Sequence, residues 1–335
     1  RVDPSGPHVK IDALQRLAAA TGRTGMLVGY AGKNDRHPGR EAANAVALCQ
    51  HGAISATRRK TLLPTYDVFD EDRYFEPANG NQPVEFNGHK IGLTICEDVW
   101  NDEDYWRDTR RYRLDPAQTL VDAGAEIIFN ISASPWCLGK DRIRLQMLGS
   151  LVAKLKRPLV YCNLVGGNDE LVFDGGSLAF NAQGQVVAHG ARFAEDFVVV
   201  DTDAAQPITP PAAPDEEMLF GALVLGLRDY LFKCGFKSAV LGLSGGIDSA
   251  LTAVLAAEAL GREHVLGVSL PSQFSSQHSL DDARALAQRL GIQYEVVPIQ
   301  PIFEVSKRQL KPVFHGRPED TAEENMQARL RGMLL

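Results

Sequence analysis

The turn Leu241-Gly-Leu-Ser-Gly-Gly-Ile-Asp-Ser249 joins a short apolar run to a pattern typical of a helix. Beyond it, strand and helix patterns alternate with short links, which predicts an α/β fold with a parallel, doubly wound sheet. The expected elements are a helix over Glu217–Lys233, a strand over Ala239–Leu243, a helix over Ser249–Leu260, a strand over Val265–Leu270, a helix over Leu280–Leu290 capped by Ser279, and a strand over Tyr294–Ile299.

The chemistry of this turn points to an anion. Gly245 and Gly246 let the backbone turn tightly, so that free N–H groups meet the positive end of the following helix dipole. The hydroxyls of Ser244 and Ser249 add donors for phosphate oxygens. Asp248 beside a phosphate indicates Mg²⁺, which would bridge the two groups.

Two other interpretations of the turn stay open at this point. It can be an ordinary strand–helix turn in which the serines and the aspartate act as caps. It also fits G-x-S-x-G, the nucleophile elbow of serine α/β-hydrolases, with Ser244 as the nucleophile. Asp282 and His315 follow in the order that such a triad requires, although this interpretation gives Asp248 no role.

A proline-rich segment divides the chain. Asp201–Glu217 contains Pro207, Pro210, Pro211 and Pro214, which predicts an extended, semi-rigid linker. We therefore expect one domain over residues 1–200, a linker over residues 201–217 and a second domain over residues 218–335.

The first block mixes strand and helix patterns with hairpins, which favours an α/β sandwich with mixed sheets. Asn181–Gly184 is typical of a hairpin turn. The expected strands are Gly25–Tyr30, Lys90–Ile95, Glu126–Ile131, Leu159–Leu164, Ser177–Asn181, Gln185–Ala188 and Phe197–Asp201, and the expected helices are Ile11–Ala20, Pro116–Ala123 and Asp141–Lys154.

Composition narrows the class of protein. The 335 residues carry a net charge of −7, which disfavours nucleic acid as the main partner. The 5 cysteines are scattered and form no C-x-x-C pair, so a disulfide framework or a zinc site is not expected. No run approaches the roughly 18 apolar residues of a membrane span, and the first residues do not resemble a signal peptide. We expect a soluble cytoplasmic protein.

A cysteine and a lysine stand out in the first block. Cys96 ends the apolar run Lys90–Ile95, and catalytic nucleophiles favour such strand ends. A thiolate needs a nearby cation, which Lys60 in Arg58-Arg-Lys-Thr-Leu-Leu-Pro-Thr-Tyr-Asp-Val-Phe-Asp-Glu71 can provide. Taken singly, Cys96 is more often a buried structural residue and Lys60 a surface charge.

The second block resembles a known family. Ser244-Gly-Gly-Ile-Asp-Ser249 is similar to the S-G-G-x-D-S phosphate loop of ATP pyrophosphatases. NAD synthetases within that superfamily resemble this chain also at Leu225–Tyr230, Leu270–Ser272, Ser279–Ala283 and Thr321–Gly332. The resemblance implies that Asn325 and Arg329 contact deamido-NAD, with Arg331 a weaker candidate. Without it, the two arginines would form a solvated helix face.

The first block resembles the nitrilase-like glutaminase domain of glutamine-dependent NAD synthetases, also at Val165–Gly176. This implies that Cys96 attacks the side-chain amide of glutamine, while Lys60 stabilises the oxyanion and a glutamate acts as base. The remaining matching positions would line the glutamine pocket, and they are Tyr66, Glu97, Ser134 and Lys140.

The resemblance implies glutamine, ATP and deamido-NAD as substrates, Mg²⁺ beside Asp248, and a homo-oligomer. The segment that carries the family's catalytic glutamate has no match in the printed sequence, because Glu41 stands in a different context. The segment that follows R-x-R-G in the family has no match either. We expect the chain to lack the N-terminal part of the first domain and the C-terminal part of the second. A non-catalytic nucleotide-binding protein stays open as another class.

Overall fold

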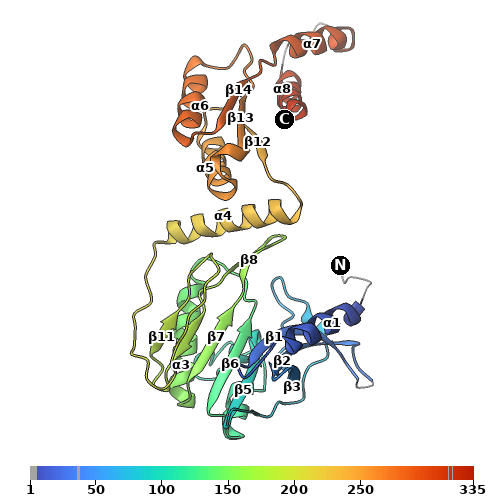
Figure 1. Ribbon diagram of the computed structural model, residues 1–335. Coiled ribbons are helices and arrows are strands. Elements are labelled where there is room, and N and C mark those ends of the chain that lie inside the picture. Colours follow the sequence, from blue (N-terminus) through green and yellow to red (C-terminus); the bar gives the residue numbers. More distant parts are fainter. Residues whose placement is uncertain (1–5, 36–37, 316, 319) are drawn as a thin grey trace. The chain divides into compact units, whose positions relative to one another are not determined.

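The computed structural model describes residues 6–35, 38–315, 317–318 and 320–335 (Figure 1). The chain forms two compact units, and each is described on its own. The first comprises Arg1–Gly166 and Phe173–Asp215, and the second comprises Gly167–Val172 and Glu216–Leu335.

The first unit is a sandwich of two sheets between helices. The antiparallel sheet has the order β1-β2-β3, and the larger sheet has the order β11-β10-β7-β6-β5-β4. Its elements are α1 (Gly6–Ala19), β1 (Met26–Lys33), β2 (Ala42–Gln50), β3 (Ala53–Arg59), η1 (Glu71–Arg73), β4 (Val84–Phe86), β5 (His89–Ile95), η2 (Cys96–Val99), α2 (Pro116–Asp122), β6 (Ile127–Ser132), α3 (Lys140–Leu155), β7 (Leu159–Asn163), β10 (Leu178–Phe180) and β11 (Val186–His189). Between β7 and β10, β8 (Val165–Asn168) and β9 (Leu171–Asp174) pair with each other.

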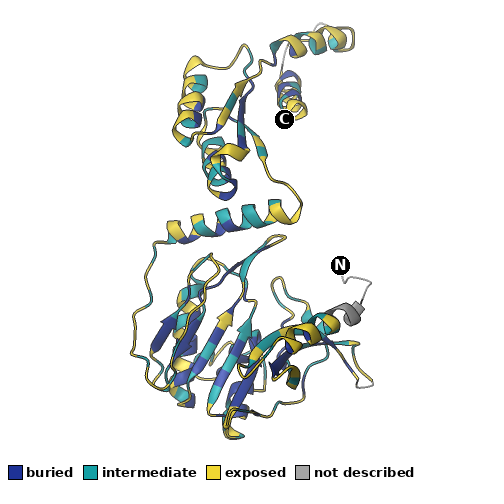
Figure 2. Ribbon diagram, viewed as in Figure 1, coloured by how far each residue is buried: buried dark blue, intermediate teal, exposed yellow. Residues whose placement is uncertain are grey.

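Strand β2 shows how the layers are built. Its side chains alternate between the faces of the sheet, as in any strand. Val46 and Leu48 pack with Leu93 of β5 between the two sheets. Ala47 and Cys49 face the other way and pack with Leu14 of α1. On the far side of the larger sheet, α2 and α3 bury their apolar side chains against β6 and β7. Figure 2 shows that buried residues concentrate in β2, β5, β10 and β11, whereas β1 and β3 are mostly intermediate or exposed.

The larger sheet positions the site. Strands β5, β6 and β7 run parallel, so their carboxyl ends meet at one edge. Cys96 follows β5, and Ser134 follows β6 by two residues. Side chains far apart in the sequence therefore meet at this edge.

The second unit contains a three-stranded parallel sheet in the order β12-β13-β14. Helices α4, α5 and α6 share one core with Val265, while Leu266 and Val268 face Ile299 at the start of α7 on the other side. The elements are α4 (Asp215–Lys233), β12 (Ala239–Gly242), α5 (Ile247–Leu260), η3 (Arg262–His264), β13 (Val265–Ser269), α6 (Gln277–Leu290), β14 (Gln293–Val296), α7 (Gln300–Phe314) and α8 (Thr321–Leu334).

The predicted fold class is confirmed in both units, but some predicted elements are wrong. Phe197–Asp201 is not a strand, although its sequence is strongly apolar. Ser276, and not Ser279, caps α6, because the Ser276 hydroxyl accepts a hydrogen bond from the Ser279 N–H at 3.1 Å. The linker ends earlier than Glu217, since α4 begins at Asp215. Strands β2 and β3 were not predicted, because alanine-rich Ala42–Gln50 lacks the usual strand composition.

None of the helices in the described part of the chain combines the length and the hydrophobicity that a bilayer-spanning segment needs.

Candidate active site

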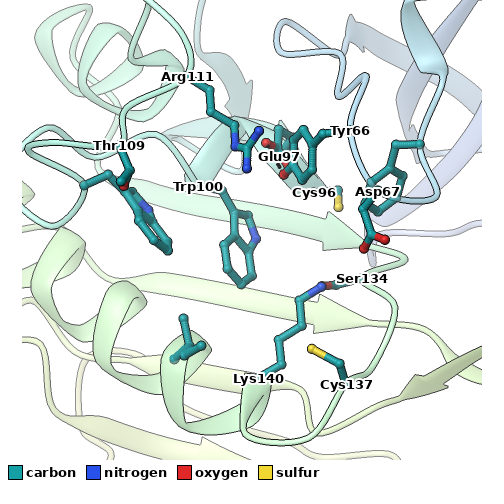
Figure 3. A pocket seen from close by; sticks show the side chains of 13 residues that line it. Tyr66, Asp67, Cys96, Glu97, Trp100, Thr109, Arg111, Ser134, Cys137 and Lys140 are labelled. Carbon is teal, nitrogen blue, oxygen red and sulfur yellow. Dashed lines mark hydrogen bonds between the residues drawn. The ribbon is translucent and has the colours of Figure 1, made fainter.

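A cavity of about 530 Å³ opens at the carboxyl edge of the larger sheet in the first unit (Figure 3). Five of the side chains that the sequence predicts for one site line this cavity, namely Tyr66, Cys96, Glu97, Ser134 and Lys140. Lys60 is not among the lining residues and exposes only 1% of its surface, but it is near enough to Cys96 for its charge to act on the thiol. The structure thus gathers the predicted residues of the first block in one place.

Cys96 sits at a sharp change of backbone direction, where β5 ends and η2 begins. Its φ of +44° lies in the left-handed region, which a residue with a Cβ seldom adopts. Burial raises the pKa of its thiol, and the charge of Lys60 only partly opposes this. Burial therefore favours the neutral thiol, which must lose its proton before it can act as a nucleophile.

Lys60 is a buried cation with a carboxylate partner. Its Nζ lies 2.6 Å from Oε1 of Glu71, and Oε2 of Glu71 accepts a hydrogen bond from the Asn44 side chain at 3.3 Å. The interpretation of Lys60 as a surface charge is therefore wrong. Glu71 was not predicted as a site residue, although it ends the segment that carries Lys60. It acts as a positioning residue, because it fixes the ammonium group in the interior.

Asp98 joins the lysine segment to the cysteine turn. Its Oδ1 accepts hydrogen bonds from the N–H groups of Thr61 at 3.0 Å and Leu62 at 2.8 Å. Its Oδ2 accepts one from the Ile95 N–H at 3.1 Å. Burial raises the pKa of this carboxyl to about 6, although the three N–H groups and Lys60 oppose the shift. Asp98 therefore sets the distance between the two segments.

Glu97 forms one wall of the cavity. Its Oε1 accepts a hydrogen bond from the Tyr66 hydroxyl at 2.7 Å and another from the Tyr112 hydroxyl at 3.3 Å. Burial, followed by the contact with Glu97, raises the pKa of the Tyr66 phenol. Both phenols thus remain protonated donors. Tyr112 was not predicted, because it lies in an irregular segment without a motif.

Ser134 and Lys140 come from the segment after β6. The Ser134 N–H donates to Oδ1 of Asn163 at 3.1 Å, which fixes the turn. The Lys140 Nζ donates to the carbonyl of Pro135 at 2.8 Å, and burial lowers the pKa of this amine. The cavity therefore combines a thiol, a buried carboxylate and amine or hydroxyl donors.

The glycine-serine turn in the second unit is open. The Ser244 and Ser249 hydroxyls lie 3.1 Å apart, and the Gly246 N–H donates to the Ser244 hydroxyl at 3.2 Å. Gly245 has a φ of +82°, and Asp248 is exposed in the first turn of α5. In the described part of the chain, Ser244 is hydrogen-bonded to neither Asp282 nor His315. The geometry therefore suits an anion better than a serine nucleophile.

A cavity of about 460 Å³ lies beside this turn, and Ser244 and Arg331 line it. Arg331 donates from Nε to the carbonyl of Leu270 at 3.1 Å. Asn325 and Arg329 are exposed on α8 and are not among the residues that line the cavity. Among the described residues, no group of three or more histidine, cysteine or carboxylate side chains could hold a metal ion.

Comparison with known proteins identifies the class. Residues 4–207 match the carbon-nitrogen hydrolase family, and residues 219–335 match the NAD synthase family. The chain therefore belongs to the carbon-nitrogen hydrolase family, whose match covers more than half of it. The predicted resemblance to glutamine-dependent NAD synthetases is also confirmed by individual relatives.

Two curated relatives named glutamine-dependent NAD(+) synthetase illustrate the similarity. The protein from Synechocystis sp. is 46% identical over 87% of this chain and 53% of its own length. The protein from Thermotoga maritima is 38% identical over 96% of this chain and 60% of its own length. The chain thus spans between half and two thirds of these relatives.

A solved structure agrees with both units. The glutamine-dependent NAD+ synthetase from Acinetobacter baumannii, in complex with ADP, matches with a TM-score of 0.87 and 32% identity over 98% of this chain and 60% of its own. The enzyme from Cytophaga hutchinsonii matches in fold, with a TM-score of 0.77 at 20% identity over 98% of this chain and 61% of its own. These findings do not support the serine hydrolase alternative.

Proposed function

We propose that the protein makes NAD from deamido-NAD, with glutamine as the nitrogen donor. The single observation that carries this proposal is the cavity that gathers Cys96 with Tyr66, Glu97, Ser134 and Lys140. A second support is the phosphate-loop sequence Ser244–Ser249 in a region that matches NAD synthase. We assign residues 1–200 to the amidohydrolase domain, residues 201–214 to the linker and residues 215–335, from the start of α4, to the synthetase domain.

In the first reaction, Cys96 Sγ attacks the side-chain amide carbon of glutamine. A carbon–sulfur bond forms, and the carbonyl oxygen becomes an oxyanion that the Lys60 ammonium stabilises. The amide nitrogen then leaves as ammonia, and water releases glutamate from the thioester. Because burial raises the pKa of the Cys96 thiol, a base is needed to accept its proton. In the family that the chain resembles a glutamate accepts this proton, and we assign the role to none of the described residues.

In the second reaction, ATP occupies the turn of Ser244, Gly245, Gly246 and Ser249. The carboxylate of deamido-NAD attacks the α-phosphorus of ATP, and diphosphate leaves. Ammonia then attacks the acyl adenylate, and AMP leaves with the formation of NAD. Asn325 and Arg329 are proposed contacts of the deamido-NAD.

Asp248 fits Mg²⁺. It is an exposed carboxylate, and Mg²⁺ in nucleotide sites usually takes one or two carboxylates, phosphate oxygens and water. The ion would neutralise phosphate charge when bound. Since no other carboxylate cluster surrounds Asp248 in the described residues, the remaining ligands would come from the nucleotide and water.

A homo-oligomer in the cytoplasm completes the proposal, and it rests on the resemblance alone. Sedimentation of the purified protein tests the assembly.

The test of the function is Cys96→Ala in the protein as it occurs in the cell. We expect NAD formation from glutamine to fall below detection, while formation from added ammonium salt stays within about twofold, because the two reactions use separate sites. Loss of both activities would contradict the assignment of Cys96 to the glutaminase reaction. Loss of neither would remove Cys96 from the mechanism.

A further inference from the structure

Arg111 lines the cavity of the first unit, although it belongs to none of the motifs on which the sequence analysis relied. It belongs to the irregular segment between η2 and α2, and its side chain lines the cavity together with Cys96. The guanidinium carbon lies 3.7 Å from the centre of the Tyr66 ring. Figure 3 shows the side chain extending from its loop toward Tyr66.

The N–H groups of Arg111 form no hydrogen bond with the described residues. Among the described residues, no carboxylate lies within ion-pair distance of its guanidinium, and no hydrogen bond from it is formed. Stacking on Tyr66 uses the face of the guanidinium and leaves the in-plane N–H edges available. Such an edge binds a carboxylate with two parallel hydrogen bonds.

The stack also holds Arg111 in place. Tyr66 donates its hydroxyl to buried Glu97 at 2.7 Å, which fixes the ring on which the guanidinium lies. The position of Arg111 is thus tied to the same wall that carries Glu97. An arginine fixed in this way loses little side-chain entropy when it binds an anion.

Lys140, the other cation of the cavity, suits this task less well. Its Nζ already donates to the Pro135 carbonyl at 2.8 Å. Burial lowers the pKa of this amine, so its protonated form is less favoured than that of an exposed lysine. Figure 3 shows it reaching the cavity from the side opposite to Arg111.

We propose that Arg111 binds the α-carboxylate of glutamine and thereby selects a free α-amino acid over other amides. The proposal rests on the proposed function, in which this cavity binds glutamine. Arg111 is then a specificity residue: it touches the end of the substrate remote from the reacting amide. The acidic side chains of Glu97 and Asp67, which line the same cavity, suit the α-ammonium group.

The test measures alkylation of Cys96 by two chlorinated reagents with intact-protein and peptide mass spectrometry. The first is the chloromethyl ketone analogue of L-glutamine, and the second is chloroacetamide, which has no α-amino acid group. In both, the sulfur forms a bond to the CH2 carbon and chloride leaves. The variants are Arg111→Gln, Arg111→Lys and the matched control Arg113→Gln, an exposed arginine of the same segment that does not line the cavity.

We expect Arg111→Gln to slow alkylation of Cys96 by the ketone about tenfold, which corresponds to the loss of one charge-assisted hydrogen-bonded pair. The rate of alkylation by chloroacetamide should stay within about twofold. Arg111→Lys should recover part of the rate, and Arg113→Gln should change neither reagent. A third reagent is the same ketone with its α-carboxylate replaced by a carboxamide. It should alkylate the unsubstituted protein about tenfold more slowly than the carboxylate form does. It should react with Arg111→Gln no more slowly than the carboxylate form, because both changes remove the same interaction.

Equal slowing of both reagents by Arg111→Gln would overturn the proposal, since Arg111 would then act on the thiol or the fold. An unchanged ketone rate would overturn it as well. If the unsubstituted protein shows no preference for the ketone over chloroacetamide, the glutamine pocket itself is wrong, and the proposed function fails together with the inference.

Discussion

The two sites of this chain are built in opposite ways. Around Cys96, the partners are buried, and Lys60 and Asp98 each expose only 1% of their surface. Around Ser244, the serine, Gly246 and Asp248 are exposed, and every side-chain hydrogen bond of the turn stays within five residues. A nucleophile must be organised before its substrate arrives, because its charge has to be controlled. A phosphate loop is completed by the ligand itself.

This difference predicts that side-chain substitutions in the first site weaken the fold more than those in the second site, where the main loss is in ligand binding. The chain has 3 tryptophans, Trp100, Trp106 and Trp136, and all belong to the first unit. Tryptophan fluorescence therefore follows the unfolding of that unit alone. Circular dichroism follows both units.

The largest effect is expected for Lys60→Met. Because the change leaves the Glu71 carboxylate without its buried partner, the free energy of unfolding of the first unit should fall by about 3 kcal/mol. Urea titration followed by tryptophan fluorescence measures this loss. Adding Glu71→Gln to Lys60→Met should restore part of the stability but none of the proposed glutaminase activity. A double variant as unstable as Lys60→Met alone would show that the ion pair is not the cause.

The next effect concerns the pH dependence of Asp98. The folded protein holds this proton more tightly than the unfolded chain, with a pKa of about 6 against 3.8. The associated stability is therefore fully present below pH 3.8 and is lost as the pH rises through 6, a change of about 3 kcal/mol.

Asp98→Asn should remove this component. Urea unfolding of both proteins at several pH values between 4 and 7 gives the difference in unfolding free energy. That difference should shift in favour of the variant as the pH rises. A difference independent of pH would mean that Asp98 does not titrate in this range.

A smaller effect is expected for Gly245→Ala in the second site. The left-handed backbone at a φ of +82° costs a residue with a Cβ about 1–2 kcal/mol. The new Cβ would also lie 2.4 Å from the carbonyl oxygen of Ser279, so the turn must shift. ATP should no longer raise the melting temperature, which calorimetry measures.

Gly246→Ala is the matched control for the backbone of the turn, because Gly246 has an ordinary φ of −87° and meets only the Ser244 hydroxyl, at 3.3 Å. Its folded stability should change less than that of Gly245→Ala. Equal losses would show that the φ of Gly245 is not what matters.

The smallest effect on stability is expected for Asp248→Asn. The side chain is exposed, so the free energy of unfolding should change by less than about 0.5 kcal/mol. The dependence of ATP binding on Mg²⁺ should nevertheless be lost, as isothermal titration with and without the ion would show. A fold that weakens as much as in Lys60→Met would break the contrast between the two sites.

The same contrast explains what the sequence could predict. The proposed phosphate loop is contiguous in sequence, so its residues and its position between β12 and α5 could be predicted from one short segment. The first site was visible only in part. Cys96 and Lys60 lie in motifs, but the role of Asp98 depends on the N–H groups of Thr61 and Leu62, which the fold brings to it.

Residues in irregular segments were the hardest to predict. Tyr112 and Arg111 follow no periodicity, and only the fold places them at Glu97 and Tyr66. Phe197–Asp201 shows the reverse error, since an apolar run indicates a strand only where a neighbouring strand is there to pair with it.

The backbone conformation of Cys96 has a consequence for which residues evolution would favour at position 96. Its left-handed conformation suits glycine better than a residue with a Cβ, so the proposed nucleophile occupies a place where the backbone alone favours glycine. Selection for the thiol and selection for stability therefore pull in opposite directions at one position. If a duplicate of this gene no longer needed the proposed glutaminase reaction, glycine is the residue that we would expect to accumulate at position 96.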